Sequence, residues 1–247
     1  MDRKTVRKRF RAAPRSDDRL TVKLSDVAAR AGVSAATASR ALNAPDKVSE
    51  AMRERVRAAA AALGYVPDAA ARALASRRSR TIGAVVPTLT NPIFATGVQG
   101  LESRLEERGY ALVVASSDYR ADKELRQATT LMERGVEGLM FVGTAHRPAL
   151  HPLLRSRGIP YVTTWSLDAP DGDPCIGFDN VEAAVRLTDY LLDLGHRRFA
   201  VIAGVTRDND RAEARVAGIR KALDSRGVRL GAGQLVEVPY EVAEGRE

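Results

Sequence analysis

The fold of the first third of this chain is determined by residues 24–74, which read LSDVAARAGVSAATASRALNAPDKVSEAMRERVRAAAAALGYVPDAAARAL. Apolar residues recur there at three- and four-residue spacing, which predicts three short helices over residues 25–31, 35–42 and 50–63. The first two helices are joined by AGVS at residues 31–34. Two short helices on such a turn match a helix-turn-helix, and the third helix is expected to close a three-helix core.

A serine marks the start of each predicted helix. Ser25, Ser34 and Ser49 stand where a hydroxyl accepts a free amide hydrogen of the first helical turn. Gly32 supplies the permissive backbone that the turn between the first two helices needs. The third helix carries one apolar stripe, which is expected to face the other two: Met52, Val56, Ala59, Ala60 and Leu63.

The positive charge of the chain is concentrated at its N-terminal end. The net charge of +8 divides into +11 for residues 1–80, with 19 Lys and Arg against 8 Asp and Glu, and −3 for residues 81–247, with 20 against 23. Residues 1–20 are basic, lack an apolar pattern and are predicted to be a disordered arm. This distribution indicates a polyanion such as nucleic acid as partner, although charge alone leaves a merely solvated arm equally open.

From residue 81 onward, short apolar strands alternate with helices. Such alternation is typical of a parallel sheet with helices on both faces. The predicted fold class is therefore a multi-domain α+β protein, with an all-α helix-turn-helix headpiece followed by an α/β part. Strands are expected at residues 82–87, 110–116, 138–142, 160–165, 175–179, 199–204 and 234–238, and helices at 93–108, 122–134, 148–157, 181–194 and 208–226.

A series of motifs runs along residues 20–238. They are DVAARAGVS, SRALN, VS, LGY and a hinge ending in ARAL, followed by IGAVVPTLTNPIF, GVEGLMFVG, GFDN, LGHRR and RVAG. Taken together, these motifs resemble the lactose/galactose repressor (LacI/GalR) family of transcriptional regulators. The sequence around GFDN at residues 177–180 and HRP at residues 146–148 is similar to that of gluconate-type regulators. The resemblance implies a periplasmic-binding-protein-like sensor, and these domains: basic arm 1–20, helix-turn-helix domain 21–66, hinge helix and linker 67–80, sensor N-subdomain 81–164 and partial C-subdomain 165–247.

The resemblance also implies a function. Members of this family are DNA-binding regulators, more often repressors than activators, whose operator affinity is controlled by a small-molecule effector such as a sugar or sugar acid. It implies double-stranded operator DNA as a partner, a homodimer for the full-length protein and a cytoplasmic location. Effector binding is expected to shift the two subdomains and change whether paired hinges order on DNA. Induction and corepression both stay open.

Family members continue well beyond the equivalent of Glu247. The chain is therefore expected to be a fragment or a C-terminally truncated reading frame. Its incomplete sheet is expected to expose an edge and to weaken dimerisation.

A helix-turn-helix reads sequence by placing its second helix in the major groove. Arg40 follows the same helical face as Ala36 and Asn43, and its guanidinium is suited to two parallel hydrogen bonds with guanine, the alternative being a solvated charge. Ala35 and Ala36 stand where the family varies residues that set operator preference. Short polar side chains are expected to bind phosphate oxygens, with capping an equal alternative for the first of them: Ser34, Thr37, Ser39 and Asn43.

Ala71 and Leu74 match the family's hinge helix, which orders on operator DNA. Leu74 is expected to insert into the minor groove as an apolar wedge, the alternative being a leucine packed on the sensor. Ala71 is expected to permit close approach between paired hinge helices.

Family positions that meet the effector fall on six residues of the predicted sensor. Trp165 is suited to stacking on the apolar face of a sugar, while Asp179 and Arg215 are suited to hydroxyls or a carboxylate. Core packing is the alternative for both aromatic residues, and a surface charge is the alternative for Arg211. The expected set is Asn91, Phe94, Trp165, Asp179, Arg211 and Arg215.

The motifs do not favour other classes of protein. Doubly wound sheets also occur in nucleotide-dependent enzymes, but no GxGxxG follows the first strand and no Walker loop occurs. The three histidines lack metal-ligand spacing, and Cys175, the only cysteine, can complete neither an intramolecular disulfide nor a zinc cluster. We therefore expect no catalytic residue, no metal and no cofactor. A transport component with the same sensor fold would need an export signal, and residues 1–20 lack the apolar core of one.

Overall fold

The computed structural model describes residues 22–68, 71, 73, 78–167 and 172–240. The chain forms two compact units, residues 1–72 and residues 73–247. Within the described part, no helix combines the length and the apolar character needed to cross a membrane.

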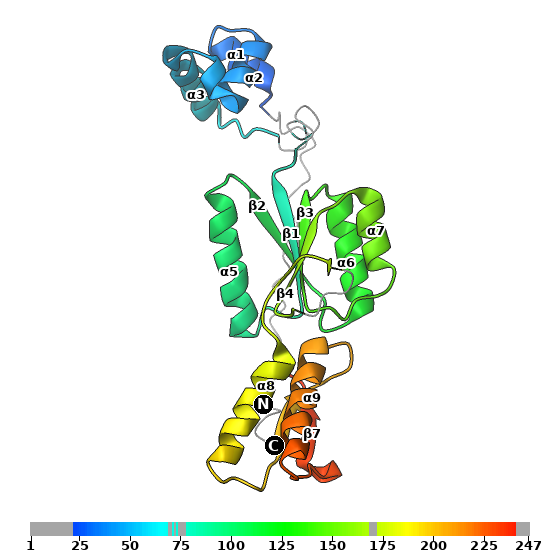
Figure 1. Ribbon diagram of the computed structural model, residues 1–247. Helices are drawn as coiled ribbons and strands as arrows, with labels where there is room; N and C mark the ends of the chain where they lie inside the picture. Colours follow the sequence, from blue (N-terminus) through cyan, green and yellow to red (C-terminus); the bar gives the residue numbers. More distant parts are fainter. Residues whose placement is uncertain (1–21, 69–70, 72, 74–77, 168–171, 241–247) are drawn as a thin grey trace, which may run out of the picture. The chain divides into compact units, whose positions relative to one another are not determined.

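The N-terminal unit is a bundle of short helices (Figure 1). Helix α1 (Leu24–Arg30) and helix α2 (Ala35–Asn43) are followed by a 3-10 turn, η1 (Pro45–Lys47), and by α3 (Glu50–Leu63). Their inner faces form the three-helix core that the apolar spacing predicts. The buried residues are mostly alanines, which let the helices approach closely: Val27, Ala28, Ala31, Ala38, Ala41, Val56, Ala59 and Ala60.

The helix starts depart in part from the serine pattern. Ser25 is not a cap, because α1 begins one residue earlier and the Asp26 carboxylate accepts the amide hydrogen of Lys23 at 2.8 Å. A carboxylate is a stronger acceptor than a hydroxyl and is favoured at a helix N-terminus, which explains the shift. Ser49 does stand at the N-cap of α3, but its side chain makes no capping bond. Gly32 has φ +60°, the left-handed conformation expected of the turn.

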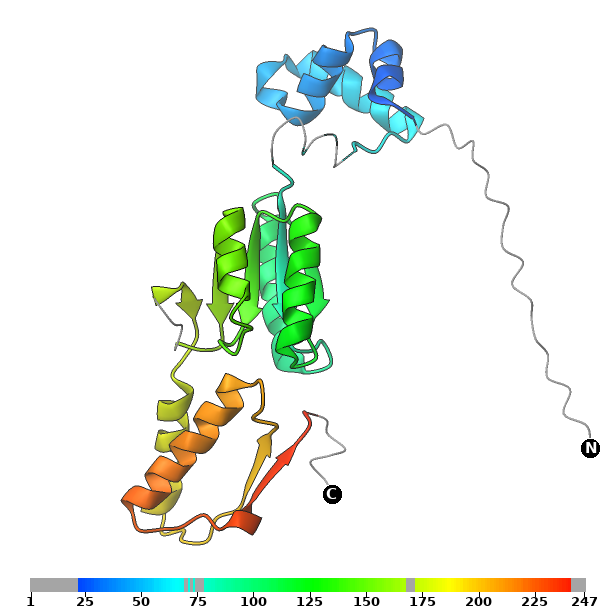
Figure 2. The same ribbon diagram turned by 90° about the vertical axis from the view of Figure 1, so that its right-hand side faces the viewer.

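The second unit contains two lobes. The first lobe is a parallel sheet with strand order β2-β1-β3-β4-β5. Helix α5 covers one face of this sheet, and α6 and α7 cover the other (Figures 1 and 2), as the alternation of strands and helices predicts. The elements are β1 (Thr81–Val86), α5 (Pro92–Glu106), β2 (Ala111–Ser116), α6 (Ala121–Glu133), β3 (Gly138–Val142), α7 (Leu150–Arg157), β4 (Tyr161–Thr164) and β5 (Cys175–Ile176).

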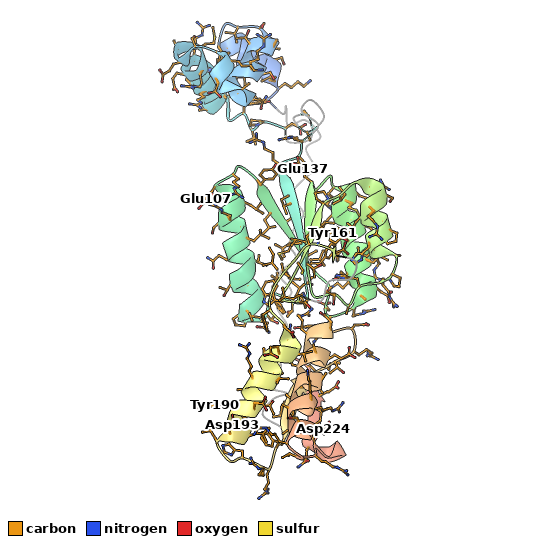
Figure 3. All side chains as sticks on the ribbon, in the orientation of Figure 1. Glu107, Glu137, Tyr161, Tyr190, Asp193 and Asp224 are labelled. Atoms are coloured by element: carbon orange, nitrogen blue, oxygen red, sulfur yellow. The ribbon has the colours of Figure 1, made fainter. Side chains whose placement is uncertain are left out.

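Successive residues of the central strands pack against opposite helix layers. Val85 and Phe141 belong to the cluster shared with α6 and α7, which Tyr161 also joins (Figure 3). Val86 and Met140 belong to the cluster that contacts α5. This two-residue period is the geometry of a strand that is buried on both faces.

The second lobe consists of α8 (Asn180–Asp193), β6 (Val201–Gly204), α9 (Asp210–Ser225), η3 (Ala232–Gln234) and β7 (Leu235–Val238). Strands β6 and β7 form a separate two-stranded parallel sheet. Helices α8 and α9, which carry the labelled residues Tyr190 and Asp224 in Figure 3, pack closely. A Cβ at Gly218 would lie only 2.4 Å from the carbonyl oxygen of Val181, so this crossing requires glycine.

The strand predicted at residues 175–179 is much shorter than expected. Only Cys175 and Ile176 pair with β4, which extends the first sheet past residue 165. At Gly177 the backbone approaches Ser166 so closely that a Cβ would lie 2.5 Å from its amide nitrogen. The chain then enters α8, whose N-cap is Asp179.

Candidate functional site

Helix α2 exposes one side and buries the other. Ala35, Ala36, Arg40 and Asn43 are exposed. Ala38, between them in sequence, is fully buried in the helical core. The residues that the sequence assigns to base reading, Ala35, Ala36 and Arg40, therefore share the solvent side of one helix with Asn43, which is assigned to phosphate contact.

The Arg40 guanidinium has neither a hydrogen bond nor an ion pair with any residue in the described part of the chain. A guanidinium carries five N–H donors in a planar fork. The fork is thus available to an acceptor outside the chain, such as the edge of a guanine.

The short polar side chains of α2 bond to one another. Ser34 Oγ accepts the amide hydrogen of Thr37 at 3.1 Å and lies 2.9 Å from the Thr37 hydroxyl. Asn43 Nδ2 donates to Ser39 Oγ at 3.4 Å. Ser34 is therefore the N-cap of α2, and phosphate contact by these four residues stays a prediction.

One of the two hinge residues falls within the described part of the chain. Ala71 is helical and exposed, and its amide donates to Asp68 Oδ1 at 3.4 Å. Leu74, the expected wedge, lies outside the described residues.

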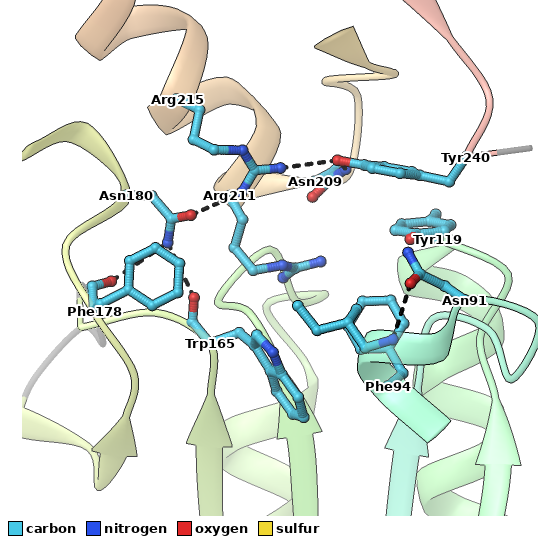
Figure 4. Close-up of a pocket in the computed structure, with 11 residues that line it drawn as sticks. Asn91, Phe94, Tyr119, Trp165, Phe178, Asn180, Asn209, Arg211, Arg215 and Tyr240 are labelled. Atoms are coloured by element: carbon cyan, nitrogen blue, oxygen red, sulfur yellow. Dashed lines mark hydrogen bonds between the residues drawn. The ribbon is translucent and has the colours of Figure 1, made fainter. Parts of the chain in front are cut away.

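A cavity of about 270 Å³ lies between the two lobes of the second unit (Figure 4). Segments far apart in the sequence supply its walls: the start of α5, the loop after β2, the end of β4, the loop after β5, the starts of α8 and α9, and the segment after β7. Five of the six predicted effector residues line it, namely Asn91, Phe94, Trp165, Arg211 and Arg215.

Two aromatic side chains pack edge to face on the first-lobe side of the pocket. The ring centroids of Phe94 and Trp165 are 5.5 Å apart, with an interplanar angle of 72°. Trp165 has φ +62°, a strained conformation for a bulky residue, of the kind that clusters at functional sites. Its indole lies against α5 at Gly97, where a Cβ would be 2.6 Å from the ring. The glycine therefore creates the space that this ring occupies.

Arg215 is held by two neutral partners from different segments. Its Nη1 donates to Asn180 Oδ1 at 2.7 Å, and its Nη2 donates to the Tyr240 hydroxyl at 2.9 Å (Figure 4). Asn180 in turn donates from Nδ2 to the carbonyl oxygen of Trp165 at 3.0 Å. The network fixes the guanidinium without neutralising its charge, which suits it to a ligand oxygen.

Tyr119 and Tyr240 stack across the lobes, with ring centroids 5.2 Å apart and an interplanar angle of 14°. Burial, followed by repulsion from the Tyr240 phenolate, raises the pKa of Tyr119 to about 12. The same two rings line a second cavity of about 420 Å³. The Tyr119–Tyr240 pair is therefore part of the wall of both cavities.

The sixth predicted effector residue, Asp179, is not among the residues that line the pocket. Its Oδ1 accepts the amide hydrogen of Glu182 at 2.9 Å as the N-cap of α8, while its sequence neighbours Phe178 and Asn180 line the pocket. The sequence did not single out these two neighbours as effector residues, nor four further lining residues: Ile93, Tyr119, Asn209 and Tyr240. Within the described residues, no cluster of three or more His, Cys, Asp and Glu side chains is suited to a metal ion.

Two family models match the chain. Residues 23–68 match the bacterial regulatory proteins of the lacI family, and residues 79–242 match the periplasmic binding proteins and sugar binding domain of the LacI family. The chain belongs to the LacI family. The resemblance read from the motifs is confirmed, and the proteins that this LacI-family chain matches are transcription regulators.

Individual relatives agree with this assignment. The ribose operon repressor of Escherichia coli K12 is 37% identical over 90% of this chain and 67% of its own length. The HTH-type transcriptional regulator GntR of the same organism is 33% identical over 89% of this chain. A crystal structure of the lac repressor dimer bound to operator and the anti-inducer ONPF matches with a TM-score of 0.75 and 27% identity, over 91% of this chain and 67% of that one. This chain spans 63% of the length of that GntR protein.

Proposed function

We propose that the chain is a sequence-specific DNA-binding transcriptional repressor whose operator affinity is controlled by a small molecule, a sugar or sugar acid, bound between the two lobes. The observation that carries the proposal is the exposed face of α2, where Arg40 has no partner within the described residues. A basic side chain on the second helix of a helix-turn-helix is placed to read base edges.

The pocket supports control by a sugar-like ligand. Phe94 and Trp165 offer apolar ring surface to the C–H face of a sugar ring. Asn91, Asn180 and Arg215 offer amide and guanidinium groups to hydroxyl or carboxylate oxygens. Apolar walls with a few convergent polar groups are typical of small-molecule sites. Because both lobes line the pocket, a ligand that prefers one arrangement of the lobes shifts the population toward it.

The proposal includes further properties that follow from this role. The full-length protein is a homodimer on double-stranded operator DNA, and Ala71 and Leu74 belong to a hinge that orders there. It acts in the cytoplasm, where the chromosome lies, and it needs neither a cofactor nor catalysis.

The test is selection of duplexes from a random library by the purified chain, followed by anisotropy titration of the selected duplex and a scrambled duplex at one salt concentration. Arg40→Ala is expected to reduce the preference for the selected duplex about 5- to 150-fold, the equivalent of about 1–3 kcal/mol for a bidentate base contact. Arg57→Ala is the matched control, since Arg57 is exposed on α3 and pairs with Glu54 at 3.2 Å. Equal binding of all duplexes, or an unaltered preference in Arg40→Ala, contradicts the proposal.

The same titration tests the effector. D-ribose and D-gluconate are added separately, and a change in duplex affinity that Arg215→Gln abolishes supports sugar control.

A further inference from the structure

The two lobes are joined by side-chain contacts at the end of β3 and the start of α9. Thr144 Oγ1 donates to Asp210 Oδ2 at 3.1 Å. Arg211 Nη1 donates to the carbonyl oxygen of Val142 at 3.0 Å and to Asp210 Oδ1 at 2.8 Å. These bonds connect residues 66 and 69 positions apart in the sequence. They therefore supplement the passage of the chain from the first lobe into the second, which the described residues make between β5 and α8.

The contact is buried and tightly fitted. Arg211 is only 7% exposed. Gly143, at φ +80°, lies directly against it, and a Cβ there would be 1.5 Å from Arg211 Nη1 and 2.3 Å from Asp210 Oδ1. The amide of Gly143 also donates to the carbonyl oxygen of Thr164, which fixes this backbone to β4. Only glycine accommodates both the backbone angle and the approach of the guanidinium.

Separation of the lobes would break the bonds that cross between them. Arg211 would lose the Val142 carbonyl and Asp210 would lose the Thr144 hydroxyl, while the ion pair between Arg211 and Asp210 lies within α9 and would remain. Because Arg211 is buried and Asp210 is mostly so, the lost bonds must be replaced by water, which opposes separation. The contact therefore favours the joined arrangement of the lobes.

The position of this contact links it to the pocket. Asn209, the N-cap of α9, directly precedes Asp210, and Arg215 lies one helical turn beyond Arg211. Both Asn209 and Arg215 line the pocket. The bonds that hold the start of α9 against β3 therefore also determine the positions of the Asn209 and Arg215 side chains.

We infer that Gly143, Thr144, Asp210 and Arg211 form an interlobe latch, which holds the lobes in the arrangement that forms the pocket and sets how readily a ligand changes it. This inference rests on the proposed control by a ligand in the same pocket. Arg211 and Asp210 are positioning residues of the latch, and Arg211 acts through α9 rather than as the principal ligand donor.

The test measures the separation of the lobes directly. Spin labels are placed at exposed positions of the two lobes, Glu102→Cys on α5 and Arg220→Cys on α9, in a Cys175→Ser background. Pulsed dipolar spectroscopy on the whole chain is expected to give one narrow distance distribution. Arg211→Gln and Gly143→Ala are expected to widen it at least about twofold or to add a second, longer distance. Arg186→Gln is the control, because Arg186 is exposed on α8 and pairs with Glu182 within that helix.

Thr144→Val provides a milder variant if the others fail to fold, because it removes one hydrogen bond and keeps the shape of the side chain. It is expected to widen the distribution in the same direction by a smaller factor. Distributions in folded variants that match that of the parent chain overturn the latch, even if the melting temperature falls, since stability alone would then be its role. Loss of DNA selectivity in Arg40→Ala concerns α2 and leaves these distances unchanged, so the two proposals fail separately.

Discussion

One arginine lies on the exposed side of α2, the reading face, which consists of Ala35, Ala36, Arg40 and Asn43. Another lies in the pocket between the lobes, and the two are held in different ways. Arg40 is exposed and has no partner in the described part of the chain, whereas Arg215 is half-buried and bound to Asn180 and Tyr240. A free guanidinium binds its target without breaking an internal bond. A ligand that reaches Arg215 must join or replace an existing network.

This difference fits the two proposed roles. A surface that reads DNA benefits from a rigid helix with free donors, because the target supplies the missing acceptors. A sensor benefits from donors that already have partners, because exchanging those partners changes the contacts between the lobes. The comparison is sharpened by changes that affect one region and leave the other intact.

The largest effect is expected from Gly97→Ala, which alters the pocket and leaves α2 untouched. The new Cβ would lie 2.6 Å from the Trp165 indole, so the ring must move. Overpacking of this kind is expected to lower the free energy of unfolding of the second unit by about 1–3 kcal/mol. Trp165 is the only tryptophan in the chain, so its fluorescence emission reports the displacement directly.

The matched control is Gly100→Ala on the same helix, where a Cβ meets nothing within 4 Å. It is expected to stabilise the helix by about 0.5–1 kcal/mol and to leave the emission unchanged. If Gly97→Ala also leaves the emission and the stability unchanged, Trp165 does not pack against α5 as described.

The same contrast explains what the sequence can predict. The reading face of α2 follows from nine residues of one helix, whose period and N-cap are local properties. The pocket joins Asn91, Trp165 and Arg215, which no local pattern relates. Only the family resemblance named them, because their proximity depends on how two lobes pack.

The residues missed at the pocket show the limits of each signal. Asp179 is expected from the family resemblance to bind effector, which stays a prediction, and an aspartate directly before a helix is also typical of an N-cap, a role that it has here. Tyr119 and Tyr240 follow the carboxyl ends of β2 and β7, and the rule that ligands bind beyond the carboxyl ends of parallel strands points to them. No rule predicts that the two rings stack.

An intermediate effect is expected from Ser34→Ala, which alters α2 and leaves the pocket intact. The change removes the acceptor for the Thr37 amide at the N-cap. Loss of such a cap is expected to lower the free energy of unfolding of the N-terminal unit by about 1 kcal/mol. Thermal unfolding followed by circular dichroism measures it.

Ser49→Ala is the control for this prediction. Ser49 occupies the N-cap of α3 but makes no capping bond, so its removal is expected to cost much less. Equal losses in the two variants would show that the Ser34 hydroxyl contributes no specific bond. A larger loss of stability in Ser34→Ala than in Ser49→Ala would show that α2 depends on a local N-cap, whereas the pocket depends on the packing of distant segments.

The smallest effect is expected from pH, and it concerns only the stacked pair of Tyr119 and Tyr240 at the pocket. The pKa of Tyr119 is raised to about 12, first by burial and then by repulsion from the Tyr240 phenolate, while Arg211 and Arg215 oppose the shift. The neutral phenol is therefore favoured in the folded chain. Its contribution to stability is fully present below pH 10, where the unfolded tyrosine keeps its proton, and is lost as pH rises from about 10 toward 12.

Denaturant unfolding of the parent chain and Tyr119→Phe at matched pH values between 9 and about 11.5 isolates this contribution, since lysines titrate alike in both. The free energy of unfolding of the parent chain is expected to fall more steeply with pH than that of Tyr119→Phe. Only the parent chain has this phenol, which ionises at a lower pH in the unfolded chain than in the folded one. Parallel slopes would mean that Tyr119 is solvated like a free phenol and is not buried against Tyr240. A steeper slope of unfolding free energy against pH for the parent chain, with the stability of the N-terminal unit unchanged, would show that the pocket contains a buried network that the reading face of α2 lacks.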